Sequence, residues 1–330
     1  MKIEEKYCIS ARDDYISNLA FHPDGEILAT CGYDEIIRLW DIKTGKKIRA
    51  FNRRDYVRDI AFSPDGKILA SAEYERIILR KVDTGKIFSR LNLNELTLSC
   101  SRSYVYAVAF SPNSHIVAGS DGDNRISWFN VKTGVLIKTL NHSDDELCYE
   151  INDLEFSPDG KILASCSEDR TIKLWEFTTG KLIRTLTGHT EDVYGIAFSP
   201  NGCILASYSW DNTIKFWDVS TGKKIRTLES YDYSVSCVAF HPNGKILASG
   251  SEERIQLWDV ETGKEICTLN NHSQESNHSR EVKSVVFSPD GQLLVSADKA
   301  GIVRIWHGDL PKMSNIEIVR LIKNPKKSQS

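Results

Sequence analysis

The sequence predicts an all-β protein made of seven similar four-stranded antiparallel sheets, and a repeated motif is the main reason. The block Phe-(Ser/His)-Pro-(Asp/Asn) recurs at intervals of 41 to 48 residues along the 330-residue chain. A regular period of this length is typical of proteins built from repeated structural units. No stretch shows sustained helical periodicity. The seven copies of the block begin at Phe21, Phe62, Phe110, Phe156, Phe198, Phe240 and Phe287.

Residues 188–228 form the clearest repeat, and they show how each unit is expected to fold. Four strand-like segments, VYGIAF, CILASYS, TIKFWDV and KKIRTL, are separated by polar turns. In the first turn Pro200 supplies a fixed φ and Gly202 accommodates a positive one. Short strands with frequent turn signals of this kind indicate an all-β fold.

A single four-stranded sheet of this size cannot cover both of its own faces, so the units must pack against one another. A radial arrangement buries each sheet against two neighbours and leaves only short edges. We therefore expect a seven-bladed β-propeller over residues 1–308, followed by a C-terminal tail at residues 309–330.

The third strand of several repeats ends in Trp-Asp, and this dipeptide carries a family resemblance. It stands at Trp40-Asp41, Trp217-Asp218 and Trp258-Asp259. Over roughly residues 1–308 the sequence resembles the WD-repeat proteins. The resemblance implies a scaffold that binds a partner protein or peptide and catalyses no reaction. The alternative is a target-recognition or sensor subunit of a larger regulatory or defence assembly, with the effector on another chain.

Closure of the ring can also be predicted from the repeat register. Residues 6–10 precede Phe21 by the same distance as the fourth-strand segment 183–187 precedes Phe198. The last repeat has only its first three strands, and a closed ring leaves no open sheet edge. We expect the N-terminal strand to complete the last blade. Residues 316–322, which are also strand-like, remain the alternative.

Composition restricts the location and the partners of the chain. The net charge of -3 and the pI near 6.3 predict no attraction to nucleic acid or acidic lipid. There is no secretory signal and no apolar run long enough for a membrane helix. The eight cysteines are scattered without a CxxC pair, which indicates free thiols in a reducing compartment. We expect a cytoplasmic protein that binds neither nucleic acid nor membrane, monomeric alone but a subunit of a complex.

The fifth repeat contains a histidine, a serine and an aspartate that resemble a hydrolase triad. Ser207 lies mid-strand rather than on an exposed elbow, and no oxyanion-hole loop accompanies it. At the family's spacing the resemblance implies a structural tetrad, which is a buried chain of hydrogen bonds. Its members are His189, Ser207, Asp211 and Trp217 in the fifth repeat and Ser165, Asp169 and Trp175 in the fourth, where a longer loop displaces His142.

Other repeats keep the tetrad unevenly, and the sequence offers no other reactive group. The second repeat keeps only Ser71 and Glu75 and the third only Asp123, so blades two and three are expected to be the softest. Thr-Gly-Lys recurs without a phosphate-binding motif, and His272 and His278 lack zinc-like ligand spacing. We expect no catalytic residue, no metal, no cofactor and no cluster of acids in the channel.

The resemblance implies that two positions per repeat point into the top opening of the propeller. The position after the first-strand Val or Ile holds Ser17, Arg58, Tyr106, Asn152, Tyr194, Ser236 and Lys283. The position before the tetrad acid holds Tyr33, Tyr74, Gly122, Glu168, Trp210, Glu252 and Lys299. Exposed Tyr, Trp and Arg often anchor interfaces. The candidate partner-binding residues are therefore Tyr33, Arg58, Tyr74, Tyr106, Tyr194, Trp210 and Lys283, and loops 92–104, 141–150 and 270–281 emerge on the same face.

Overall fold

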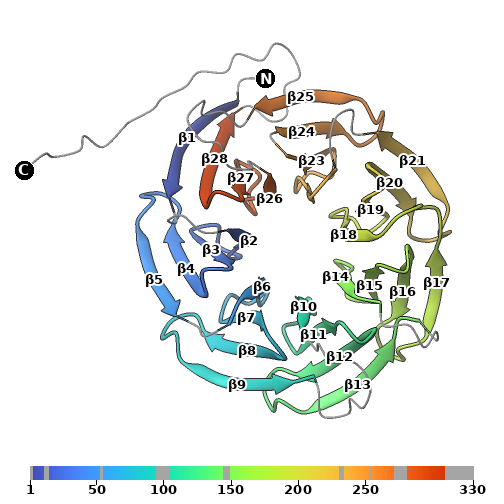
Figure 1. The fold of residues 1–330 in the computed structure, drawn as a ribbon, viewed down its shortest axis with the longest axis horizontal. Helices are drawn as coiled ribbons and strands as arrows, with labels where there is room; N and C mark the ends of the chain where they lie inside the picture. Colours follow the sequence, from blue (N-terminus) through green and yellow to red (C-terminus); the bar gives the residue numbers. More distant parts are fainter. Residues whose placement is uncertain are drawn as a thin grey trace, which may run out of the picture.

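Seven four-stranded antiparallel sheets stand around a central opening in the computed structural model (Figure 1). This confirms the predicted fold class. The structure describes residues 3–10, 15–52, 55–93, 104–143, 149–229, 234–252, 254–270 and 281–308. Among these residues there is no helix long and apolar enough to span a membrane. The predicted tail 309–330 and the alternative closing strand 316–322 lie outside the described residues.

The strands of each blade run outward from the centre of the ring in chain order (Figure 1). The first blades are β2 (Ile16–Phe21), β3 (Ile27–Gly32), β4 (Ile36–Asp41), β5 (Lys47–Asn52); β6 (Val57–Phe62), β7 (Ile68–Glu73), β8 (Arg76–Lys81), β9 (Ile87–Asn92); and β10 (Val105–Phe110), β11 (Ile116–Asp121), β12 (Arg125–Asn130), β13 (Leu136–Asn141). The next are β14 (Ile151–Phe156), β15 (Ile162–Ser167), β16 (Ile172–Glu176), β17 (Leu182–Leu186); β18 (Val193–Phe198), β19 (Ile204–Ser209), β20 (Thr213–Asp218), β21 (Lys224–Glu229); and β22 (Cys237–Phe240), β23 (Ile246–Gly250), β24 (Arg254–Asp259), β25 (Glu265–Asn270). The seventh blade contains β26 (Val282–Phe287), β27 (Leu293–Asp298), β28 (Ile302–Gly308) and β1 (Ile3–Ser10).

The N-terminal strand lies at the outer edge of the seventh blade. There β1 pairs antiparallel with β28, from Ile3 opposite Gly308 to Ser10 opposite Ile302 (Figure 1). The two ends of the described chain therefore share one sheet, and the third strand of the last blade is covered at its edge.

The Ser-Pro-(Asp/Asn)-Gly motif builds the turn between the first two strands of a blade. In the fifth blade Ser199 Oγ donates to Asn201 Oδ1 at 2.7 Å and accepts the amide of Ile204 at 2.9 Å. Gly202 has a φ of 71°, which a residue with a side chain adopts only at a cost. The same amide-to-serine contact recurs at Ser63, Ser111, Ser157 and Ser288.

The hydrophobic core lies between the blades rather than at the centre of the ring. The buried apolar residues form seven clusters, and each cluster joins two neighbouring blades. Between blades four and five, for example, Leu174 packs in one cluster with Ile196 and Trp217. Each blade thus depends on its neighbours for burial, and both polar and apolar side chains line the central opening.

Candidate partner-binding site

A repeated irregularity in the innermost strands turns one side chain per blade toward the top opening. In blade two Val57 lies opposite Glu73 and Asp59 opposite Ala72, so Arg58 has no partner residue in the ladder. Such a bulge bends the strand and re-aims a side chain. The same register shift leaves Ser17, Asn152, Tyr194 and Lys283 without a partner residue in the pairing of the first two strands of their blades. In blade three the shift falls at residues 106–107.

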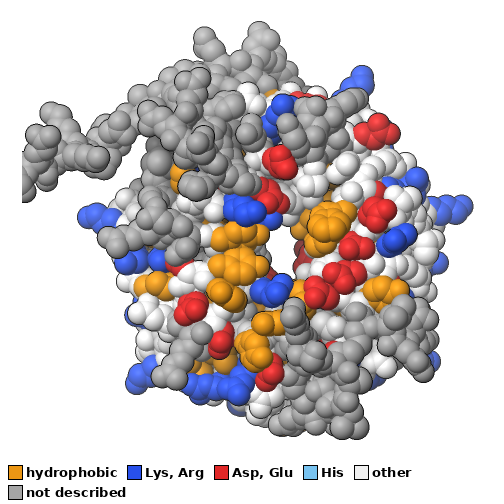
Figure 2. All heavy atoms as spheres, viewed as in Figure 1, with side chains coloured by type: hydrophobic (Ala, Val, Ile, Leu, Met, Phe, Trp, Pro, Cys, Tyr) orange, Lys and Arg blue, Asp and Glu red, His pale blue; other side chains and the backbone are white. Residues whose placement is uncertain are grey.

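The bulged side chains converge on a central cavity of about 580 Å³. All seven residues of the first predicted set line it, since Ser236, which precedes β22, joins the others. From the second set, Tyr33, Tyr74 and Trp210 stand on turns at the same end of the ring and are 41, 46 and 60 % exposed. The structure therefore brings the predicted residues together around one opening. Figure 2 shows this end, with apolar and charged side chains gathered about the hole.

Aromatic rings gather on the side formed by blades one to three. Tyr33 lies between Tyr15 and Tyr56, with ring centroids 4.5 and 4.9 Å away. Farther along, Tyr74 packs edge-on against Tyr104 at 4.9 Å. The guanidinium of Arg58 lies over two rings, 4.3 Å from the centroid of Tyr106 and 5.1 Å from that of Tyr104. We call these tyrosines and Arg58 the aromatic side of the top face.

Sequence reasoning missed three of these tyrosines. Tyr15, Tyr56 and Tyr104 all stand immediately before the first residue of an innermost strand, at Ile16, Val57 and Val105. The signal was present in the repeat, because the same position holds Glu150, Asp192 and Glu281 in other blades. Aligning that position across the repeats separates an aromatic side from an acidic one.

Blades four and five form the acidic side of the top face, shown in Figure 2 to the right of the opening. Burial and the nearby charge of Glu150 raise the pKa of Glu168. Burial, with the charges of Asp192 and Glu168, raises the pKa of Tyr194 to about 12. The ring of Tyr194 packs against Trp210 with centroids 5.1 Å apart. A cationic group would relieve this accumulation of negative charge.

A groove of about 700 Å³ connects the acidic side with blade seven. Its walls include Trp210, Tyr194 and, at the far end, Lys283. Lys283 forms an ion pair with Glu281 and lies 5.3 Å from the centre of the Tyr15 ring. Aromatic, basic and acidic groups thus follow one another around the opening.

Three carboxyl groups line the central cavity, although no cluster of acids was expected there. Asp59, Asp153 and Glu155 belong to the innermost strands of blades two and four. Each accepts a backbone amide from the innermost strand of the next blade, whose inner edge has no strand beside it. These amides belong to Val108, Ile196 and Phe198, at 2.7, 3.0 and 2.6 Å.

Burial raises the pKa values of all three channel acids. The pKa of Asp59 is raised to about 6 and that of Asp153 to about 7, and the pKa of Glu155 lies well above its usual value. The three acids act as links between blades. Among the described residues no group of three or more histidines, cysteines and acids is placed to hold a metal ion.

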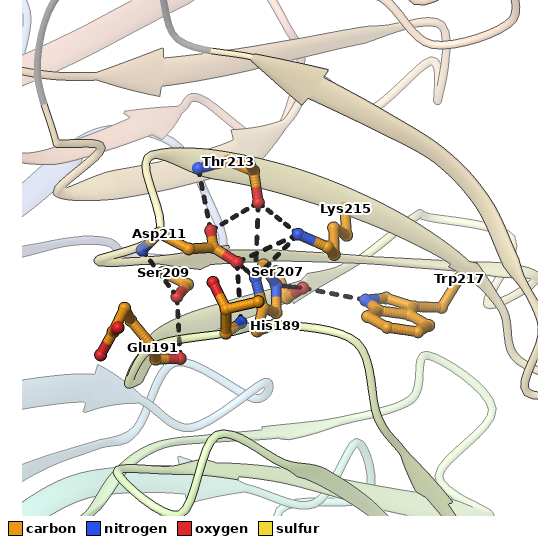
Figure 3. A network of polar contacts seen from close by, with 9 residues as sticks. His189, Glu191, Ser207, Ser209, Asp211, Thr213, Lys215 and Trp217 are labelled. Atoms are coloured by element: carbon orange, nitrogen blue, oxygen red, sulfur yellow. Dashed lines mark hydrogen bonds and ion pairs between the residues drawn. The ribbon is translucent and has the colours of Figure 1, made fainter.

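The tetrad of the fifth blade forms the predicted buried chain of hydrogen bonds (Figure 3). Trp217 Nε1 donates to Ser207 Oγ at 2.9 Å, and His189 Nε2 lies 2.7 Å from the same oxygen. His189 Nδ1 lies 2.7 Å from Asp211 Oδ2. Burial lowers the pKa of His189. Burial alone would raise the pKa of Asp211, but the hydrogen bonds from His189 and Thr213 outweigh it and lower that pKa well below its usual value. The imidazole is buried within this network.

The fourth blade corrects one expectation, because His142 is not displaced. Its Nδ1 lies 2.8 Å from Ser165 Oγ, which also accepts the indole N–H of Trp175 at 2.9 Å. Its Nε2 lies 3.6 Å from Asp169 Oδ1. The additional residues of this loop come after His142, so the imidazole keeps the place that His189 has in blade five.

The second and third blades correct the positions of the tetrad acids. The buried acid of blade two is Glu73 rather than Glu75, and it pairs with Arg80, which replaces the tryptophan. In blade three Asp121, two residues before Asp123, accepts the amides of the turn. Blade seven follows the same pattern, with Asp298 bound to Arg304 at 2.7 Å.

The geometry defines a class of protein: a repeat-built propeller in which polar networks hold the blades and one end carries a varied, exposed surface. Comparison with known families agrees. The model described as WD domain, G-beta repeat matches residues 4–41, 45–79 and 94–130, and the model described as IFT122 first beta-propeller matches residues 150–320. Comparison with curated proteins finds no match.

The chain belongs to the WD-repeat β-propeller family, since the second model alone covers just over half of it. Propellers of this family generally serve as protein-interaction scaffolds and are typically non-catalytic. The first repeat match begins within β1 and ends at Asp41, so it joins the N-terminal strand to the first three strands of blade one.

Proposed function

We propose that this chain is a non-catalytic scaffold that binds a partner protein or peptide on the top face. The observation that carries the proposal is the convergence of all seven positions of the first predicted set on one cavity, ringed by exposed tyrosines and Trp210. Large aromatic side chains and arginine supply most of the binding energy in protein interfaces. Tyrosine also loses little conformational entropy when it is covered.

The charge pattern indicates how a peptide would lie across the opening. Its basic end would meet Glu168 and Asp192 on the acidic side, where burial and neighbouring carboxylates raise the pKa values of both acids. Its apolar or acidic end would lie on the tyrosines and Arg58. Complementary charges of this kind fix the orientation of a partner and speed its association.

The absence of catalysis is part of the proposal. The channel acids accept backbone amides of the neighbouring blade, and the Ser-His-Asp arrangement of blade five is buried in a structural network. We propose a cytoplasmic protein, monomeric alone, that functions as a subunit of a complex with its partner.

Affinity purification from the native cell tests the top face. The double variant Tyr74→Ala/Trp210→Ala removes one exposed ring from each side of the opening, and we expect recovery of the partner to fall at least about tenfold. A matched control, Ile137→Ala/Ile183→Ala, removes exposed apolar groups from the outer strands β13 and β17 and should leave recovery unchanged. Equal recovery with the double variant and wild type would place the binding site elsewhere.

A further inference from the structure

At the opposite end of the ring, basic side chains fasten neighbouring blades together. In four junctions a lysine or arginine on the fourth strand donates to a backbone carbonyl in the turn between the third and fourth strands of the next blade. Arg49 reaches two such carbonyls, those of Val82 and Asp83, at 3.3 and 3.0 Å. The other donors are Lys138 to Thr179, Arg184 to Ser220 and Arg226 to Glu261. We call this contact the junction clamp.

The junction between blades two and three has no such donor. Ser89 occupies the clamp position on β9. It lies over the next turn as the other clamp residues do, because a Cβ placed on Gly134 would meet Ser89 Oγ at 3.0 Å, just as one on Gly85 would meet Arg49 Nη1 at 3.0 Å. A serine hydroxyl is too short to span the turn. Among the described contacts, the carbonyl of Lys132, which corresponds to that of Asp83, accepts no hydrogen bond.

A groove of about 1170 Å³ lies at this junction. It runs between the turns of blades two and three, and its apolar walls are formed by Ile68, Val82, Val131 and Phe88. Phe88 is 40 % exposed although it is a large apolar side chain. The groove therefore places apolar side chains beside Val131 and Lys132, the residues that correspond to the clamped Val82 and Asp83 of the preceding junction.

We propose that this groove binds an arginine of a partner peptide together with the apolar residue beside it. The guanidinium takes the place of the missing clamp and donates to the carbonyl of Lys132, while the apolar neighbour packs on Phe88 and Val82. Arginine fits better than lysine, because its planar fork can reach two adjacent carbonyls, as Arg49 does in the preceding junction.

The charges that line the groove are compatible with this occupant. The carbonyl groups present the negative ends of their dipoles, and Asp65 and Asp83 line the groove together with Lys67, Lys81 and Lys132. Lys67 is 3.4 Å from Asp65 and so is already paired. Lys81 and Lys132 are exposed, and their long side chains can extend into water.

A titration of the isotope-labelled full chain by NMR tests the groove with a defined probe, the blocked tripeptide acetyl-Leu-Arg-Leu-amide. We expect saturable amide shifts confined to residues 81–88 and 130–134. The matched probe acetyl-Leu-Met-Leu-amide, which has similar length and no donor, should bind at least about tenfold more weakly. Trp210→Ala should leave the titration unchanged, which separates this site from the top face.

Three variants examine the mechanism of binding. Ser89→Arg supplies the clamp within the chain and should lower the affinity for the arginine probe at least about tenfold. The control Ser89→Ala should leave this affinity unchanged. Phe88→Ser should also lower the affinity for the arginine probe. This variant provides a test that does not require Ser89→Arg to fold. Equal binding of the two probes, equal binding by Ser89→Arg, or no saturable shift up to about 10 mM probe would overturn the proposal.

Discussion

Blade five and blade two solve the same structural problem with different residues. In blade five the indole of Trp217 donates to Ser207, and His189 completes the chain of hydrogen bonds. In blade two the guanidinium of Arg80 donates to Ser71 at 2.6 Å, and its charge is balanced by Glu73 at 2.7 Å. The serine is retained, and the donor that binds it has changed from a neutral ring to a cation.

The two blades also differ on the surface, and this difference is not compensated. Blade five keeps the junction clamp through Arg226, whereas blade two has Ser89 at that position. A substitution that places a charge in the buried part of a repeat needs a second substitution to balance it, because an unbalanced buried charge destabilises the fold. A departure on the surface needs none, because water satisfies the exposed carbonyl. Surface departures are therefore free to create new binding features.

The largest expected effect comes from breaking the buried pair of blade two. Arg80→Met keeps much of the volume but leaves the Glu73 carboxylate buried without the guanidinium, so we expect a loss of about 3–5 kcal/mol in the free energy of unfolding. Trp217→Phe in blade five removes only one donated hydrogen bond and should cost about 1 kcal/mol. Unfolding in urea measures both variants.

A double variant distinguishes the buried charge from general damage to the core. Arg80→Trp combined with Glu73→Ser gives blade two the residue types of blade five at both positions. Replacing a buried ion pair with well-packed groups is often neutral or stabilising, so the double variant should regain at least the stability of the wild type. Continued loss of stability would show that the surrounding core is built for arginine.

The fold was predictable because the repeat determines its backbone. Every blade carries its turn motif at the same place, and the bulge recurs at the same register in most blades, so all seven positions of the first predicted set line the central cavity. His189 and its tetrad partners were predictable for the same reason.

Predictions failed where a side chain acts from a neighbouring position or across blades. Glu73 takes the place of Glu75 because its side chain is buried beside Arg80, with which it forms an ion pair. Counting positions cannot show this, since the repeat fixes Cα atoms and not the reach of a side chain. The channel acids were missed because Asp153 binds the amide of Ile196 in the next blade, a contact that no single repeat contains.

A pH titration of stability compares the channel acids with an exposed one. Burial raises the pKa of Asp153 to about 7, above its unfolded value near 3.9, so its folded state favours the proton. Its contribution to stability is fully present below about pH 4 and is lost as the pH rises toward 7. Asp153→Asn removes this loss, and its stability relative to wild type should increase by about 2 kcal/mol between pH 5 and pH 8.

Asp159 provides the matched control for this titration. The hydrogen bond from Ser157 lowers the pKa of Asp159, so its charge does not change between pH 5 and pH 8. Asp159→Asn should therefore show a constant difference from wild type over that range. A constant difference for Asp153→Asn as well would mean that Asp153 titrates as an exposed acid.

The smallest expected effect on stability comes from giving blade four the clamp residue of blade two. Arg184 is exposed, and Arg184→Ser should change the free energy of unfolding by no more than about 0.5 kcal/mol. The variant removes the hydrogen bond to the carbonyl of Ser220. In blade four Ile183 occupies the position that Phe88 has in blade two. If the missing clamp alone creates an arginine site, the variant should show new amide shifts at residues 218–222 with acetyl-Leu-Arg-Leu-amide. No new shifts in the variant would mean that the aromatic wall of Phe88 is required in addition to a free carbonyl. Shifts at these residues in the wild type would mean that the probe binds without loss of the clamp.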